Sequence, residues 1–135
     1  MRKLFWIAIT ICLAGACKKA VEDAKMNYIL DAMTNGQWYV YSFQEGDSSL
    51  TKPFAPYTFQ FYRDGKVSGF TSTTEDKGTW VGDPTAMTIS SDFPDAADPV
   101  KKLNALWKVT DSALDYVKAE TTISGVKSQL YLKKK

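Results

Sequence analysis

Alternation of apolar and polar residues divides this chain into an N-terminal apolar run, one amphipathic segment and a long succession of short strands. Residues 4–13 (LFWIAITICL) form the apolar run. Further along, Val21, Ala24, Tyr28 and Ala32 recur at spacings of three and four, the period of a helix face. Asn35 and Gly36 are typical of a helix end. The pattern therefore predicts a tether and helix before residue 36, which packs on the following domain or closes one end of it.

After Gly36, aromatic and β-branched residues come in short runs separated by turn residues, as in an all-β domain. Asp64-Gly65 is the strongest hairpin signal. Gly82-Asp83-Pro84 and Asp111-Ser112 indicate further turns, and residues 98–103 a short helix with Pro99 in its first turn and Asp98 as a candidate cap. The eight predicted strands cover residues 37–44, 56–63, 66–72, 77–82, 86–91, 104–110, 113–120 and 127–133.

Eight consecutive strands favour an antiparallel meander. Closure of the meander into an up-and-down barrel removes its two free edges, which otherwise invite aggregation. An eight-stranded barrel is either packed solid or holds one small ligand. The predicted fold is thus all-β, an eight-stranded antiparallel barrel with a short N-terminal helix.

Alternation along the first strand places Trp38 and Val40 on one face and Tyr39, Tyr41 and Phe43 on the other. The second set is either an exposed aromatic patch, which marks a partner or sugar site, or core covered by the helix. The inward set either fills a solid core or lines an apolar pocket.

The first residues have the order of a secretory signal. Met1-Arg2-Lys3 is basic, the apolar run follows, and Ala14-Gly15-Ala16 are small residues before Cys17. The run is shorter than the ~20 residues that span a bilayer. Small residues directly before a cysteine resemble the lipobox of bacterial lipoproteins, and the lysines after Cys17 resemble Bacteroidota examples. The resemblance implies cleavage after Ala16 and a lipid on Cys17. An ordinary signal peptide with a free Cys17 thiol is the alternative.

Charge and composition restrict the function. The chain has 17 basic and 15 acidic residues, and two of the basic ones, Arg2 and Lys3, lie in the leader. A mature chain of balanced charge does not suit general nucleic-acid binding. The chain has no histidine, and both cysteines, Cys12 and Cys17, belong to the leader region. This excludes Ser-His-Asp triads, Cys-His pairs and His-containing metal sites, and it leaves no disulfide in the folded body.

Carboxylates are the remaining candidates for chemistry. Asp92, Asp95 and Asp98 recur at spacing three in a loop, and carboxylate oxygens suit Ca²⁺. The spacing lacks the alternate-residue pattern of the known calcium loop, so a solvated acidic loop is the better interpretation. We expect no enzyme activity, no metal and no cofactor.

Several short motifs resemble lipocalin-like domains across residues 36–133. They are Gly36-Gln37-Trp38, Phe59-Gln60-Phe61 followed by Asp64-Gly65, Gly78-Thr79-Trp80 and the strand at Trp107. The resemblance implies that Trp38 plugs one barrel end beneath a late-strand cation. No arginine follows Arg63, so Lys108 or Lys118 is the candidate cation. The resemblance also implies an apolar ligand, and the candidate contacts are Trp38, Val40, Phe59, Phe61, Trp80, Met87 and Trp107.

These observations predict three segments: a signal peptide over 1–16, a lipid-anchored tether and helix over 17–35, and a lipocalin-like barrel over 36–135. The function they favour is a non-catalytic lipoprotein of the cell envelope, anchored most simply in the outer membrane, that binds a small apolar ligand. The alternative is an interaction module that docks an envelope protein or glycan through an aromatic patch.

Overall fold

The structure is a computed structural model that describes residues 19–135. The predicted signal peptide, its cleavage site and the lipidation site at Cys17 lie outside these residues. Within the described residues, the buried apolar side chains fall between Ala32 and Leu132. Residues 19–135 therefore contain a hydrophobic core of their own, and we expect this fragment to fold independently.

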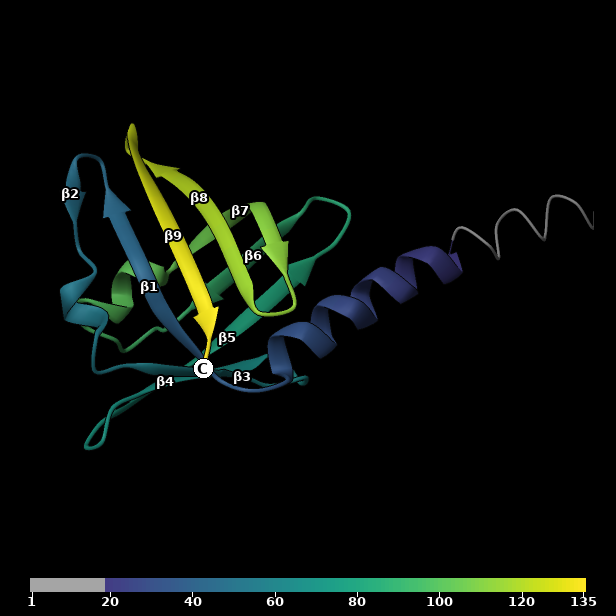
Figure 1. The fold of residues 1–135 in the computed structure, drawn as a ribbon, viewed down its shortest axis with the longest axis horizontal. Coiled ribbons are helices and arrows are strands. Elements are labelled where there is room, and N and C mark those ends of the chain that lie inside the picture. The colour runs from purple at the N-terminus through teal and green to yellow at the C-terminus, as the bar shows by residue number, and fades with distance from the viewer. Residues whose placement is uncertain (1–18) are drawn as a thin grey trace, which may run out of the picture.

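The predicted N-terminal helix is confirmed and covers residues 19–34. It projects from one end of the barrel, with its last turns against the barrel and its first turns far from it (Figure 1). Gly36 adopts a φ of +89°, a left-handed conformation that lets the chain reverse directly into the first strand. The helix therefore closes one barrel end, as expected.

Nine strands and two short 3₁₀ helices follow. They are β1 Trp38–Glu45, β2 Ser48–Ser49, η1 Lys52–Phe54, β3 Thr58–Phe61, β4 Lys66–Phe70, β5 Glu75–Asp83, β6 Thr88–Asp92, η2 Val100–Leu103, β7 Ala105–Ala113, β8 Tyr116–Ile123 and β9 Val126–Lys134.

The strands form one antiparallel sheet in chain order, and β1 also pairs with β9. The two-residue β2 pairs with β1 beside the main ladder. The other eight strands close into an up-and-down barrel, which confirms the predicted fold class (Figure 1). Closure leaves the long strands without free edges, the physical reason for expecting a barrel.

The barrel interior is almost solid. Trp38, Phe43, Phe59 and Val67 are at most 2 % exposed. The far end is plugged by Phe54 of η1, by Phe93, and by Val100 and Leu103 of η2, all of them buried. The remaining interior void measures about 40 Å³. The inward side chains therefore fill a packed core, the first of the two interpretations of the sequence.

Two β-bulges change the predicted strand faces. The pairing of β1 with β9 shifts between Val40 and Ser42, so Tyr41 is an extra residue. Phe43 consequently points into the core at 1 % exposure, and the prediction that it shares an outer face with Tyr41 was wrong. A second shift between Val109 and Asp111 carries β7 through the predicted Asp111-Ser112 turn, and the chain reverses at residues 114–115 instead.

Of the two alternatives for the outer aromatic face of β1, cover by the helix is not the one observed, because the helix end at Met33 packs on Trp38 at the barrel end. The predicted short helix near Pro99 is present as η2, but it begins only at Val100 and no side chain caps it, so the prediction of Asp98 as its cap was wrong. The Asp64-Gly65 hairpin is confirmed between β3 and β4, with Gly65 at a φ of +90°.

Candidate binding recess between the helix and the barrel

An apolar recess of about 540 Å³ lies between the helix and the adjacent barrel end. One wall is the helix face predicted from the sequence, including Val21, Ala24, Tyr28 and Ile29. The opposite wall comes from the β5–β6 and β7–β8 hairpins, which contribute Met87, Ile89, Val109, Ala113 and Val117 among others. We call this hollow the helix recess.

The base of the helix is held firmly against the barrel. Met33 is buried in the core, and its carbonyl accepts a hydrogen bond from the Trp38 indole nitrogen at 2.9 Å. Ile29 packs closely on Gly82, where an added Cβ would lie 2.9 Å from the Ile29 methyl group. Glycine at this position therefore lets the helix approach β5.

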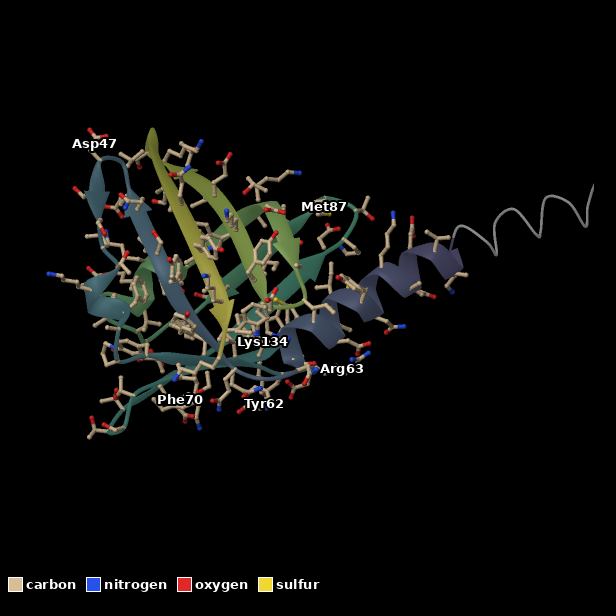
Figure 2. The ribbon with its side chains drawn as sticks, viewed as in Figure 1. Asp47, Tyr62, Arg63, Phe70, Met87 and Lys134 are labelled. Atoms are coloured by element: carbon tan, nitrogen blue, oxygen red, sulfur yellow. The ribbon has the colours of Figure 1, made fainter. Side chains whose placement is uncertain are left out.

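One flank of the helix is tied to the β3–β4 hairpin. Arg63 forms an ion pair with Asp31 at 2.6 Å and donates a hydrogen bond to the Asn27 side chain at 3.1 Å. Figure 2 shows Arg63 beside the end of the helix that meets the barrel. The recess lies along a different flank, between the helix and the hairpins, so Arg63 does not line it.

Large apolar side chains around the recess are open to solvent. Val21 is 54 % exposed, Tyr28 56 % and Met87 46 %. Met87 lies at the β5–β6 turn with a φ of +55° (Figure 2). A contiguous apolar surface of this kind on a small protein marks a binding site more often than isolated exposed residues do. The volume also falls within the usual range of small-molecule sites, about 300–1,000 Å³.

The predicted ligand residues separate into three groups. Trp38 and Met87 line the helix recess. Phe59, Phe61 and Trp107 surround the 40 Å³ interior void instead. Val40 and Trp80 line neither hollow, and Trp80 packs its edge against Phe61 at 5.3 Å between ring centroids.

Sequence reasoning missed the recess residues Ile29 and Tyr28 as ligand contacts, although it singled out their helix. The available signal was the apolar stripe itself, which continues through Val21 and Ala24 beyond the part of the helix that reaches the barrel. Where the apolar stripe of a helix is longer than the surface on which the helix packs, part of the stripe stays exposed.

The cation on the plug tryptophan is Lys134, and neither Lys108 nor Lys118 holds this place. The Lys134 Nζ lies 5.0 Å from the Trp38 ring centroid. Lys108 instead donates to the Ala86 carbonyl, and Lys118 lies over the ring of Tyr131.

A second feature lies on the outside of the barrel, where three tyrosines form a cluster. Tyr41 and Tyr131 are 4.9 Å apart by ring centroid, and Tyr116 is 6.1 Å from Tyr131. Lys133 lies 3.9 Å above the Tyr41 ring. We call this set the tyrosine cluster.

Within the tyrosine cluster, the pKa of Tyr116 is raised above its ordinary value of 10.0. The Tyr116 hydroxyl donates to Asp111 at 3.0 Å, and this hydrogen bond to a carboxylate raises the pKa of Tyr116. Desolvation and the negative charge of Asp111 act in the same direction.

The carboxylates of the acidic loop, Asp92, Asp95 and Asp98, do not form a metal site in the described residues. Among residues 19–135, no three Asp, Glu or Cys side chains lie close enough together to hold an ion, so Asp92, Asp95 and Asp98 stay apart. Within the same residues, no helix is both long enough and apolar enough to cross a membrane.

The sequence matches no protein-family profile and no curated protein at a significant level. Its fold is similar to the crystal structure of a DUF4847 family protein from Bacteroides vulgatus, with a TM-score of 0.57. The match covers 78 % of this chain and 96 % of that one, at 13 % sequence identity. At this identity the likeness concerns the fold alone, and it agrees with the barrel described above.

Proposed function

We propose that this protein is a non-catalytic binding lipoprotein of the bacterial cell envelope, and that it holds a small apolar ligand in the helix recess. The observation that carries the proposal is the recess itself, an apolar hollow of about 540 Å³ beside a barrel that is otherwise full. The lipocalin resemblance implies a ligand in the barrel mouth, and we place it in the recess between the helix and one barrel end.

The position of the recess fits a membrane-anchored protein. Cys17 precedes the first described helical residue by two positions, and a lipid there would place the helix between the membrane and the barrel. Two or three acyl chains hold a protein firmly, because each buried methylene contributes about 0.8 kcal/mol. The recess then opens along the helix that leads to the membrane, and the outer membrane is the location we propose.

Native mass spectrometry of residues 19–135, purified gently from the source envelope, tests the ligand. We expect an added mass that disappears on denaturation. Ala24 lines the recess, so Ala24→Trp should fill it and abolish the added mass. Asp23 faces away from the recess, because neighbouring helix positions differ by about 100° and it is opposite Lys25 and Tyr28. Asp23→Trp should therefore keep the ligand. Bare protein in all three samples would contradict the proposal.

Lipidation needs its own test. Replacing Cys17 with serine should abolish incorporation of labelled fatty acid and release the protein from the membrane fraction. Serine at Cys12 is the matched control, since that residue lies in the predicted signal peptide and should leave lipidation intact. Unchanged membrane association in Cys17→Ser would contradict the anchor.

A second function, docking of an envelope glycan or protein, is favoured by the tyrosine cluster. Tyr41 is 50 % exposed, and lysines flank the rings. Tyr41→Ser should weaken binding to isolated envelope glycan if this surface is the site, whereas Ala24→Trp should not. The opposite result assigns the binding to the recess.

A further inference from the structure

The charged side chains of the helix recess lie at its outer rim. Its inner end is formed by Met33, Trp38 and Val117, all of which are buried. Lys25, Asp83 and Ser112 also line the recess, and all three are exposed. Lys25 lies eight residues before Met33, about 12 Å along the helix axis. The recess therefore has an apolar inner end and a charged, solvent-exposed rim.

The two charged groups at the rim are not equivalent. Asp83 accepts hydrogen bonds from the backbone nitrogens of Thr85 and Ala86, at 3.0 and 3.1 Å, so its carboxylate stabilises the β5–β6 turn. Lys25 forms no ion pair within residues 19–135. The Asp83 carboxylate keeps its negative charge but is held in its own turn, whereas the Lys25 ammonium is free to turn toward the head group of a ligand.

We propose that the ligand of the helix recess is a single-chain amphiphile with an anionic head. This inference rests on the proposed function and specifies its ligand class. The hydrocarbon chain extends from Lys25 toward Trp38 along the helix, and the head stays at the solvent-exposed rim beside the Lys25 ammonium. The positive charge of Lys25 favours an anionic head over a neutral or cationic one.

Titration calorimetry of residues 19–135 with decanoate and decanol tests the head group. We expect decanoate to bind more tightly than decanol. Lys25→Gln should weaken decanoate binding about tenfold, a typical effect of losing one charge-assisted contact, and leave decanol binding unchanged. Lys101 is exposed on η2 at the opposite barrel end, so Lys101→Gln is the matched control and should alter neither.

The possible results separate the two proposals. Equal binding of decanoate and decanol, unaffected by Lys25→Gln but abolished by Ala24→Trp, would overturn the anionic head and keep the recess as the site. Binding of neither compound, or binding that Ala24→Trp does not change, would overturn the recess as the site of such ligands as well.

Fluorescence quenching tests the orientation of the chain. Trp38 is the one tryptophan of residues 19–135 that lines the recess, since Trp80 and Trp107 lie elsewhere in the barrel. Bromine quenches indole fluorescence at short range. 10-Bromodecanoate should therefore quench more strongly than 2-bromodecanoate, because its bromine lies at the inner end. The reverse order would overturn the proposed orientation.

Discussion

Lys134 lies across Trp38 and ties the last strand to the N-terminal helix. Its Nζ is 5.0 Å from the Trp38 ring centroid and donates a hydrogen bond to the Ala32 carbonyl at 2.9 Å. Its methylene carbons pass over Gly36, at 3.5 Å from where a Cβ would be. One side chain thus contacts the plug tryptophan, the helix end and the turn between them, and a cation at a helix C-terminus is itself favourable. Figure 2 shows Lys134 near the end of the last strand, beside the helix.

Removal of this lysine should destabilise the fold. Lys134→Met keeps most of the apolar stem but loses the cation–π contact and the hydrogen bond, and we expect a loss of about 1–3 kcal/mol in unfolding free energy. Chemical denaturation measures the change. Lys77 is 83 % exposed in its side chain, so Lys77→Met should change stability by no more than about 0.5 kcal/mol. Equal losses in the two variants would contradict the role assigned to Lys134.

The bulge at Tyr41 predicts losses of different size for Tyr41 and Phe43, which simple alternation along β1 would place on the same face. Phe43→Ala removes a ring that is 1 % exposed and contacts Phe54 and Trp107, at a cost of about 3–5 kcal/mol. Tyr41→Ala removes a half-exposed ring and should cost about 1 kcal/mol or less. Thermal or denaturant unfolding compares them. Similar losses would show that the two side chains share one face.

The contact between Ile29 and Gly82 should appear as energetic coupling. Gly82→Ala forces a Cβ to within 2.9 Å of Ile29 and should destabilise the protein, whereas Ile29→Ala makes room for it. We expect the double variant to be more stable than the sum of the single losses predicts, by about 0.5–3 kcal/mol. A Cβ at Gly78 would meet Asp92 and Phe93, so Gly78→Ala should show no coupling to Ile29. Additivity at Gly82 would contradict the contact.

The pair of Tyr116 and Asp111 predicts a pH effect. The pKa of Tyr116 is raised above its ordinary value of 10.0, first by its hydrogen bond to Asp111. A raised folded-state pKa means that the stabilisation is complete below pH 10 and is lost as the pH rises through the folded-state value. Asp111→Asn should lower the pKa of Tyr116. Titration followed by the difference absorbance of tyrosinate measures this pKa, and the Tyr116→Phe variant identifies the part of the signal that comes from Tyr116. An unchanged titration would contradict the hydrogen bond.

Local patterns were sufficient for the helix, its end at Gly36, the Asp64-Gly65 hairpin and the closed barrel. Each of these depends on neighbouring residues: helical spacing of apolar positions, a residue that tolerates positive φ, and alternation in consecutive strands. Trp38 at the plug followed from the lipocalin resemblance together with its place before the first strand.

The misplaced features all depend on contacts between distant segments. The predicted strand face of Phe43 and the predicted turn at Asp111-Ser112 were wrong. Each lies beside a β-bulge, and a bulge is defined only by the pairing of one strand with its partner. Lys134 could not be chosen over Lys108 or Lys118, because strand registers in the closed sheet decide which lysine meets Trp38.

The amino-acid sequence by itself determined the class of fold and the apolar stripe of the helix, because both follow from periodicities of neighbouring side chains. The tertiary structure decided where that stripe lies and how much of it is used. Helix and barrel meet only over the last turns, at Met33 and Ile29, and so the outer stripe at Val21 and Ala24 faces an open recess. The volume of that recess depends on packing between residues far apart in the chain, a quantity that no local pattern contains.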